Sequence, residues 1–199
     1  MRFDLLEASP AVLLGTLNTP MPFESALVAL VPEAESLVET FRNRYDPAAA
    51  IGVPAHVTIL YPFKPPSEFT NDTIAVLREL FATTPGFPVS FSETRRFPNV
   101  LYLAPNPAEP FRNLIKKISA RFPETPPYGG AFAEVIPHLT IAQLDDDQRL
   151  NEIAADFNQA AKGKLPIRAR IDAIALINNL GGPWGVQTQF ALLQGKEAS

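Results

Sequence analysis

The sequence predicts a single domain of mixed helices and strands, built from two similar lobes that share an interface. The order strand, helix, histidine-bearing strand, helix, strand occurs twice along the chain, and no flexible linker separates the two runs. We place the boundary near 97–99 and expect lobes of about 23–98 and 99–199, which can exchange their terminal strands. With 199 residues, 46% of them hydrophobic, the chain can bury a core without disulfides or metals.

In the first half, runs of β-branched and aromatic residues bounded by prolines predict strands, and apolar residues at helical spacing predict helices. The helix at 33–45, for example, places Leu37, Val38 and Phe41 on one side. The strands are expected at 25–31, 55–63 and 87–97, and the helices at 33–45 and 71–82.

The second half repeats this order and adds a final hairpin. Three aspartates, 145–147, stand near the start of its last helix, where the helix dipole favours negative charge. Asparagines and glycines at 178–182 predict a turn that joins the last two strands. The strands are expected at 99–103, 136–143, 167–177 and 184–193, and the helices at 108–122 and 146–161.

The composition excludes several classes of function. Without cysteine, the chain has no disulfide, zinc ribbon or thiolate nucleophile, which fits a cytoplasmic protein. A net charge of −4 gives no broad basic surface for long nucleic acid, whereas a nucleotide or an RNA end in a local pocket is compatible. The apolar stretch within 1–22 follows Asp4 and Glu7 and is too short for a membrane span, so we expect an N-terminal extension packed on the domain.

The two histidines of the chain carry the same local pattern. His56 and His138 are each followed by an apolar residue, then a threonine (Thr58 or Thr140), then isoleucine. Side chains alternate along a strand, so each histidine and its threonine lie on one face, about 7 Å apart. A single strand histidine is more often a packing or surface residue, but a duplicated motif at equivalent points of a repeated order indicates chemistry.

Two imidazoles and two hydroxyls suit phosphate chemistry. One neutral imidazole can accept a proton from the entering oxygen while a protonated one donates to the leaving oxygen. Threonine hydroxyls can donate to the non-bridging oxygens, where negative charge must be held. This scheme needs no metal, and it predicts a bell-shaped rate profile with both limbs near neutral pH.

The segments 55–63 (AHVTILYPF) and 137–143 (PHLTIAQ) resemble the two-histidine phosphoesterase superfamily, which includes 2′-5′ RNA ligase-like proteins and cyclic nucleotide phosphodiesterases. The resemblance extends over about 25–193. It implies an α+β fold of two pseudo-symmetric lobes, each a mostly antiparallel sheet with helices packed outside, and an active groove between them. It also implies that the two histidines are catalytic, that the two threonines bind phosphate, and that no cofactor is needed.

Four further residues are candidates for substrate binding. Tyr61 and Phe63 follow the first motif, where either ring could stack on a base. Packing in the core is the commoner role for such rings, and strand parity places both off the His56 face. Tyr128 begins a glycine-containing segment that is either a lid over the groove or a plain loop. Arg95, beside Arg96 at a strand end, could meet a terminal phosphate.

Three alternatives remain open at this point. The same residues could join RNA ends, because the reverse reaction uses the same acid and base. A non-catalytic module could bind nucleotides or RNA ends without turnover. A metal-dependent hydrolase would need carboxylates to complete a shell around the histidines, and the nearest in sequence, Glu134, lies four residues before His138.

Overall fold

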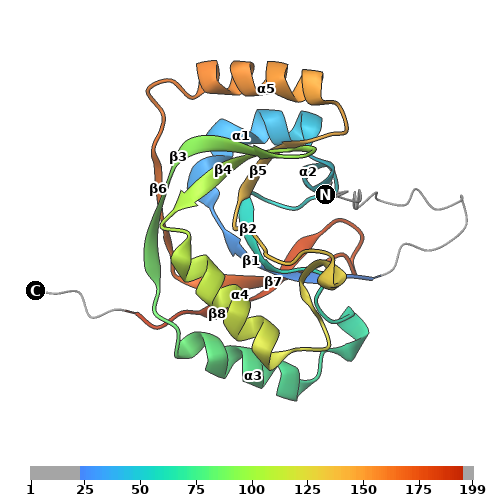
Figure 1. Cartoon of the computed structure of the whole chain (residues 1–199). Helices are drawn as coiled ribbons and strands as arrows, with labels where there is room; N and C mark the ends of the chain where they lie inside the picture. The colour runs from blue at the N-terminus through green and yellow to red at the C-terminus, as the bar shows by residue number, and fades with distance from the viewer. Residues whose placement is uncertain (1–22, 195–199) are drawn as a thin grey trace, which may run out of the picture.

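The computed structural model of the chain describes residues 23–194 as an α+β domain with two four-stranded antiparallel sheets (Figure 1). The strand orders are β2-β1-β7-β8 and β5-β4-β3-β6. The strands are β1 Ser25–Leu30, β2 His56–Leu60, β3 Phe87–Phe97, β4 Val100–Asn106, β5 Leu139–Gln143, β6 Ile167–Ile171, β7 Ala173–Asn178 and β8 Gly185–Ala191. The predicted N-terminal extension, 1–22, lies outside the described residues.

Helices α1, α3, α4 and α5 agree with the predicted segments to within a residue at each end, whereas the short α2 at Pro47–Ala50 was not predicted. Pro32 opens α1, and Thr70 caps α3 by accepting from the Thr73 amide at 3.1 Å. Asp146 caps α5 by accepting from the Arg149 amide at 2.9 Å. The helices are α1 Pro32–Tyr45, α2 Pro47–Ala50, α3 Asn71–Ala82, α4 Glu109–Arg121 and α5 Asp147–Ala160.

The two sheets do not follow the two halves of the sequence. Strand β3 comes from the first half but pairs with β4 and β6, while β7 comes from the second half and pairs with β1. The single strand predicted at 167–177 is therefore wrong. The chain breaks at Asp172 into β6 and β7, which belong to different sheets. Alternating isoleucine and alanine continue across the break, so the apolar pattern gives no sign of it.

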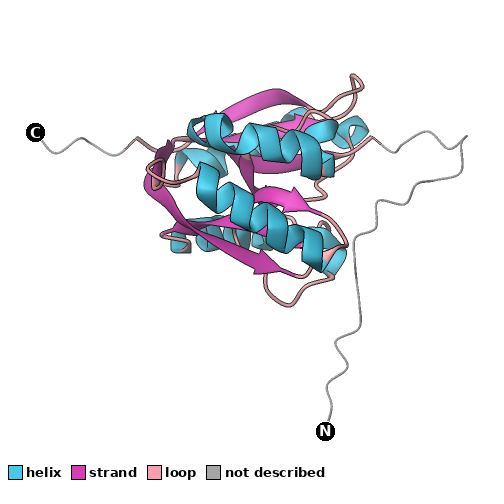
Figure 2. Cartoon of the chain, turned by 90° about the horizontal axis from the view of Figure 1, so that it is seen from above, coloured by secondary structure: helices cyan, strands magenta, loops and turns pink. Residues whose placement is uncertain are grey.

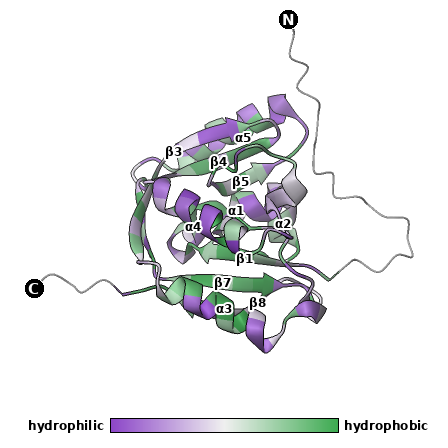
Figure 3. Ribbon diagram, turned by 60° about the horizontal axis from the view of Figure 1, so that its bottom comes forward, coloured by the Kyte–Doolittle hydropathy of each residue, from purple (hydrophilic) through white to green (hydrophobic). Residues whose placement is uncertain are grey.

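One hydrophobic core joins the two sheets, because the helices cross between them. Helix α1 of the first half packs on β5, and α4 of the second half packs on β2. Figure 2 shows helices lying against the strand layers, and Figure 3 shows apolar strands such as β1 and β7 inside with more polar helices such as α4 outside. No helix within 23–194 has the length and apolar character that a membrane span requires.

The two histidine strands meet where the sheets approach each other. β2 and β5 are edge strands of their own sheets, and they contact one another. The end of β5 lies beside the segment that precedes β2, since 43–47 and 143–144 line one cavity. Conversely, the segment before β5 lies beside the end of β2, where the Tyr128 amide donates to the Tyr61 carbonyl at 2.6 Å.

Candidate active site

His56 is partly buried at the start of β2 and is held at both ring nitrogens. Nδ1 lies 2.7 Å from the Pro54 carbonyl oxygen, and Nε2 lies 3.1 Å from Thr58 Oγ1. Because a carbonyl oxygen only accepts, the proton of the neutral ring belongs on Nδ1. The Nε2 lone pair then accepts from the Thr58 hydroxyl, so the basic nitrogen and the hydroxyl lie together, as the motif predicts.

His138 lies immediately before β5 and repeats this backbone arrangement. Its Nδ1 is 2.8 Å from the Ile136 carbonyl oxygen, again two residues upstream, so the neutral ring again carries its proton on Nδ1. Two aromatic rings pack against the imidazole at near-perpendicular angles, Phe97 at 5.0 Å and Tyr102 at 5.5 Å between ring centres. Both imidazoles thus keep Nε2 as the basic atom.

Burial and nearby charges shift the pKa values of both imidazoles. Burial lowers the pKa of His56 to about 4, opposed by its bond to the Pro54 carbonyl, and the His138 charge lowers it further. Burial also lowers the pKa of His138. Asp46 acts on both rings and raises both pKa values. The His138 charge acts on His56 and the Asp46 carboxylate acts on both rings, so the two imidazoles lie within electrostatic range of each other, and burial disfavours the protonated form of each.

A β-bulge follows each histidine motif and changes which side chains face the site. In β2, Thr58 pairs with Val28 and Leu60 with Leu27, so Ile59 is an extra residue. Parity therefore reverses after Ile59, and Tyr61 joins the face that carries Val28 rather than the main core. The prediction that Tyr61 lies off the His56 face is wrong for this reason.

The second bulge is equivalent to the first. Thr140 pairs with Tyr102 and Ala142 with Leu101, which leaves Ile141 as the extra residue. Gln143 consequently lies on the Thr140 side of β5. It stands five residues after His138, as Tyr61 stands five after His56, and this equal offset is the signal by which the sequence could have indicated it.

Phe63 does not reach the site. Its side chain is 4% exposed and packs against Phe122, with ring centres 5.2 Å apart, and against Phe69 at 6.1 Å. Its amide donates to the Ser25 carbonyl at 2.8 Å, which fixes this inward direction. The proposed base-stacking role of Phe63 is therefore corrected to a core role.

Tyr128 lies over the end of β2. It has a φ of 52°, which a tyrosine rarely adopts, within a short turn at Pro127–Gly130. Its hydroxyl lies near the Thr58 side chain, which lowers the pKa of Tyr128 against the larger raising effect of burial, and its ring packs edge-on against Tyr61 at 6.3 Å. The Tyr61 hydroxyl donates to Glu24 at 3.0 Å. Both tyrosines named from the sequence thus border the first motif.

Arg95 borders the second motif, whereas Arg96 does not. Arg95 pairs across β3 and β4 with Tyr102, which pairs in turn with Thr140, so the three side chains form one row. The exposed Arg95 guanidinium is paired with Glu93 at 2.8 Å. Arg96 points to the opposite face, where it bonds to Asp147 of α5 at 2.7 Å.

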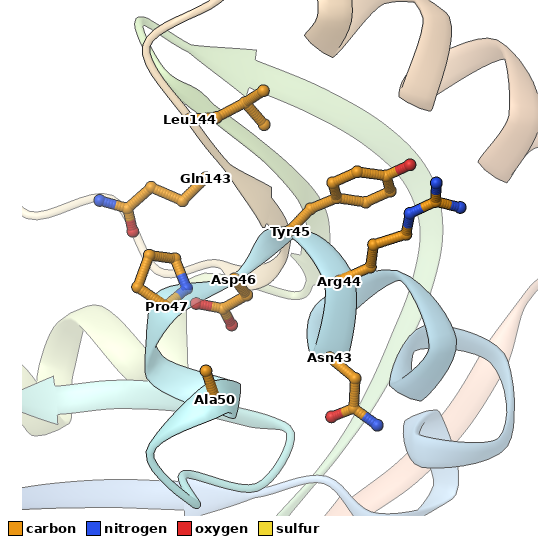
Figure 4. Close-up of a pocket in the computed structure, with 8 residues that line it drawn as sticks. All are labelled: Asn43, Arg44, Tyr45, Asp46, Pro47, Ala50, Gln143 and Leu144. Carbon is orange, nitrogen blue, oxygen red and sulfur yellow. The ribbon is translucent and has the colours of Figure 1, made fainter.

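Sequence reasoning missed a buried ion pair at the end of α1 and a cavity between that end and the end of β5. Arg42 and Asp46 lie at the end of α1, 2.9 Å apart, although Arg42 falls on the apolar stripe of α1 with Ala34 and Val38. A charged residue on a buried stripe is the signal that could have found it. Figure 4 shows Asp46 between Tyr45 and Pro47, in a cavity of about 360 Å³ that extends to Gln143.

The described residues do not bring metal ligands together. Within 23–194, no three side chains of the histidine, aspartate and glutamate types gather as a metal site would require. Glu134, the carboxylate considered for such a shell, instead lies 3.6 Å from Arg112.

The family model of the 2′-5′ RNA ligase superfamily matches residues 30–183, a stretch that contains both histidine motifs. The chain belongs to the 2′-5′ RNA ligase superfamily. The resemblance of the two motifs to the two-histidine phosphoesterases, and the α+β fold of two sheets that it implied, are confirmed.

Curated relatives of this superfamily member carry phosphoesterase names. A Geobacillus kaustophilus protein named "Putative phosphoesterase" is 27% identical over 168 residues, which are 82% of this chain and 91% of the relative. A Bacillus licheniformis protein with the same description is 25% identical over 162 residues, 79% of this chain and 91% of the relative.

Solved structures share the superfamily fold with this chain. Escherichia coli LigT complexed with 3′-AMP has a TM-score of 0.56 at 16% identity, covering 86% of this chain and 99% of LigT. TT0787 of Thermus thermophilus has a TM-score of 0.56 at 18% identity, covering 85% of this chain and 97% of TT0787. At these identities, the likeness shows the fold of the chain and leaves its reaction to be argued from the site.

Proposed function

We propose that this protein is a metal-independent phosphodiesterase that acts on a 2′,3′-cyclic phosphate or a 2′-5′ phosphodiester of nucleotides or RNA ends. The observation that carries the proposal is the duplicated geometry of His56 and His138. Each ring has Nδ1 fixed on a carbonyl oxygen two residues upstream, and each leaves a basic Nε2 on the side of its motif threonine. Two histidines that served only in packing would have no reason to share this arrangement.

The reaction needs one imidazole neutral and one protonated. In cyclic phosphate hydrolysis, one Nε2 takes a proton from the attacking water while the other imidazolium protonates the departing ribose oxygen. Burial disfavours the protonated form of both rings in the free protein, so the proposal requires one of them to take up a proton when substrate binds. A bound phosphate anion favours the charged imidazole and raises its pKa, which makes proton uptake part of substrate binding.

Three groups beside the histidines support recognition of phosphate. The hydroxyls of Thr58 and Thr140 lie on the histidine faces of their strands and can donate to the non-bridging oxygens. Arg95, in the Thr140 row, can leave its exposed pair with Glu93 for a phosphate, because an exposed pair of this kind is weak.

A nucleotide substrate is supported by the solved LigT structures, which hold 3′-AMP, ATP and NADP+. Aromatic rings near the first motif, Tyr61 and Tyr128, offer faces on which a base can stack. The same residues would serve ligation of RNA ends in the reverse direction. An activity assay, and not the geometry of the site, therefore decides between hydrolysis and ligation.

The test is turnover of 2′,3′-cyclic mononucleotides and 2′-5′-linked dinucleotides in chelator, with His56→Ala and His138→Ala beside wild type. We expect each variant to lose on the order of 10² or more in rate. Gln159→Ala, an exposed substitution on α5, is the control and keeps the wild-type rate. Activity lost in chelator and restored by metal would favour a metal-dependent hydrolase, and tight nucleotide binding without turnover would favour a binding module.

A further inference from the structure

Arg42 and Asp46 form a buried ion pair beside the histidines, and the acid–base chemistry does not use it. Their side chains are 3% and 2% exposed, and they are the only buried charged residues within 23–194. Removing two charges from water is costly, and neutral residues in place of a buried pair often leave a protein equally stable. The pair therefore calls for an explanation other than stability.

The pair holds both ends of the segment between α1 and β2. Asp46 Oδ1 accepts from the Ala48 amide at 3.0 Å, where α2 begins. Arg42 Nη2 donates to the Val53 carbonyl at 2.9 Å, while Nε of the same guanidinium contacts Asp46 Oδ2. One planar group thus connects the helix, the carboxylate and the backbone three residues before β2.

This connection continues to the His56 ring. Val53 is followed by Pro54, whose carbonyl oxygen accepts from His56 Nδ1. Proline restricts its own φ and also the backbone of the residue before it, so a fixed Val53 carbonyl limits the direction of the Pro54 carbonyl. A second side chain of α1, Glu35, accepts from the Ala55 amide at 2.5 Å. Helix α1 therefore fixes each peptide group from Val53 to the histidine.

The two charges also act on the imidazoles. Arg42 lowers the pKa of His56, whereas Asp46 raises the pKa of both His56 and His138, because α1 packs on β5 as well. The other titratable or charged groups around the two rings come from the first helix, the turn over β2 and the strands β3 and β4. They are Glu35, Tyr128, Arg95 and Tyr102.

Among residues 23–194, the segment before His138 has no buried ion pair. Its ion pairs, Lys64 with Glu124 and Arg112 with Glu134, involve exposed carboxylates. In this part of the chain, the buried pair is therefore a feature of the His56 half alone.

We propose that the Arg42–Asp46 pair is a positioning device for His56, which holds the Pro54 carbonyl on Nδ1 and so keeps Nε2 directed at the substrate phosphate. Neither residue touches the reacting atoms. The inference rests on the proposed function, because that function assigns Nε2 its role.

Two conservative variants separate the hydrogen bonds from the charge. Arg42→Lys keeps the charge, but one amine cannot reach the carboxylate and the Val53 carbonyl together. We expect kcat to fall about tenfold or more, with KM within about twofold, because the loss is one of orientation. Asp46→Asn keeps an acceptor for the Ala48 amide but removes the charge, so both imidazoles titrate at lower pH, and Asp46→Glu moves the titration back.

The titration is read by NMR, where the two histidines of the chain give two sets of ring signals. The controls are Arg170→Lys and Asp172→Asn, the same changes in an exposed pair 2.8 Å apart, and they leave kcat and both titrations unchanged. A purely structural pair would lower the melting temperature of its variants but leave kcat within twofold and both titrations unmoved, and that result would overturn the proposal.

Two further measurements keep the proposal testable. If a single variant fails to fold, the neutral double variant Arg42→Gln/Asp46→Asn takes its place, with the same expected loss of kcat. His138 then titrates at lower pH, whereas His56 does not, because the loss of Arg42 opposes the loss of Asp46 at that ring. In wild type, ring nitrogen shifts must show the His56 proton on Nδ1, and a proton on Nε2 would contradict the positioning role. If wild type turns over no substrate, the proposed function fails, while the titrations still decide whether the pair sets the state of His56.

Discussion

The His56 and His138 half-sites share a backbone motif but differ in what surrounds the ring. Each imidazole donates from Nδ1 to a carbonyl two residues upstream, and each strand bulges one residue after its threonine. His56 stands beside a buried ion pair and bonds to Thr58, while His138 packs against Phe97 and Tyr102.

The comparison shows which features the two half-sites share and which belong to one of them. Orientation of the ring comes from the local motif, which is the same in both halves, so both Nε2 atoms are available. The electrostatic setting comes from neighbours that are not duplicated: the Arg42 guanidinium acts on His56, two aromatic rings pack against His138, and the Asp46 carboxylate acts on both. The two histidines can therefore take different roles in one reaction.

The largest effect is expected from the two threonines. Thr58→Val and Thr140→Val keep the shape of the strand but remove a donor to the phosphate, and each is expected to lower kcat about 10²-fold or more. Because Thr58 also bonds to His56, Thr58→Val loses more than Thr140→Val. Steady-state kinetics on a cyclic nucleotide measure both, and equal losses would remove the asymmetry of the two half-sites.

The pH dependence is the next largest effect, and it sharpens the same comparison. With the pKa of His56 about 4 and that of His138 also lowered, the protonated partner is lost on the acid side of neutrality. We expect kcat/KM to be highest below pH 6.5 and to fall about tenfold per pH unit above its optimum. The sequence predicts limbs near neutral pH, and an optimum of kcat/KM at pH 7.5 would favour that simpler expectation.

A smaller effect is expected from the tyrosine that borders the first motif only. Tyr128→Phe removes a hydroxyl near Thr58 that can donate to a bound phosphate, but it keeps the ring on Tyr61, so we expect kcat/KM to fall about tenfold, the value of one hydrogen bond. The matched control is Tyr45→Phe, whose hydroxyl accepts from Arg149 on the outer face. If the two variants retain equal activity, Tyr128 belongs to the loop and not to the site.

The smallest effect concerns stability. A histidine whose folded pKa is about 4 contributes stability above pH 6.5, which is lost as the pH falls through 6.5 toward 4. At about 1.4 kcal/mol per pKa unit, this loss amounts to roughly 3 kcal/mol for His56. Denaturant unfolding at pH 7 and pH 4.5 should show a smaller difference for His56→Gln than for wild type, and an undiminished difference would assign the acid sensitivity to other groups.

Much of the fold and the centre of the site could be predicted from the sequence, because local patterns determine them. Helix α3 and strand β3 begin and end at the predicted residues, and the repeated motif located both histidines and both threonines. The break at Asp172 could not be predicted, since strand pairing is a long-range property that alternation does not encode. Tyr61 was misplaced because one extra residue at Ile59 reverses parity without a sequence signal.

The central claim, that the two histidines act as one acid–base unit, is tested most directly by the double variant. Rates of 2′,3′-cyclic nucleotide hydrolysis would be compared for His56→Ala, His138→Ala and His56→Ala/His138→Ala. Residues that act together are strongly non-additive, so we predict that the double variant loses no more than either single variant. Losses that multiply, or one single variant that keeps the wild-type rate, would contradict the paired mechanism.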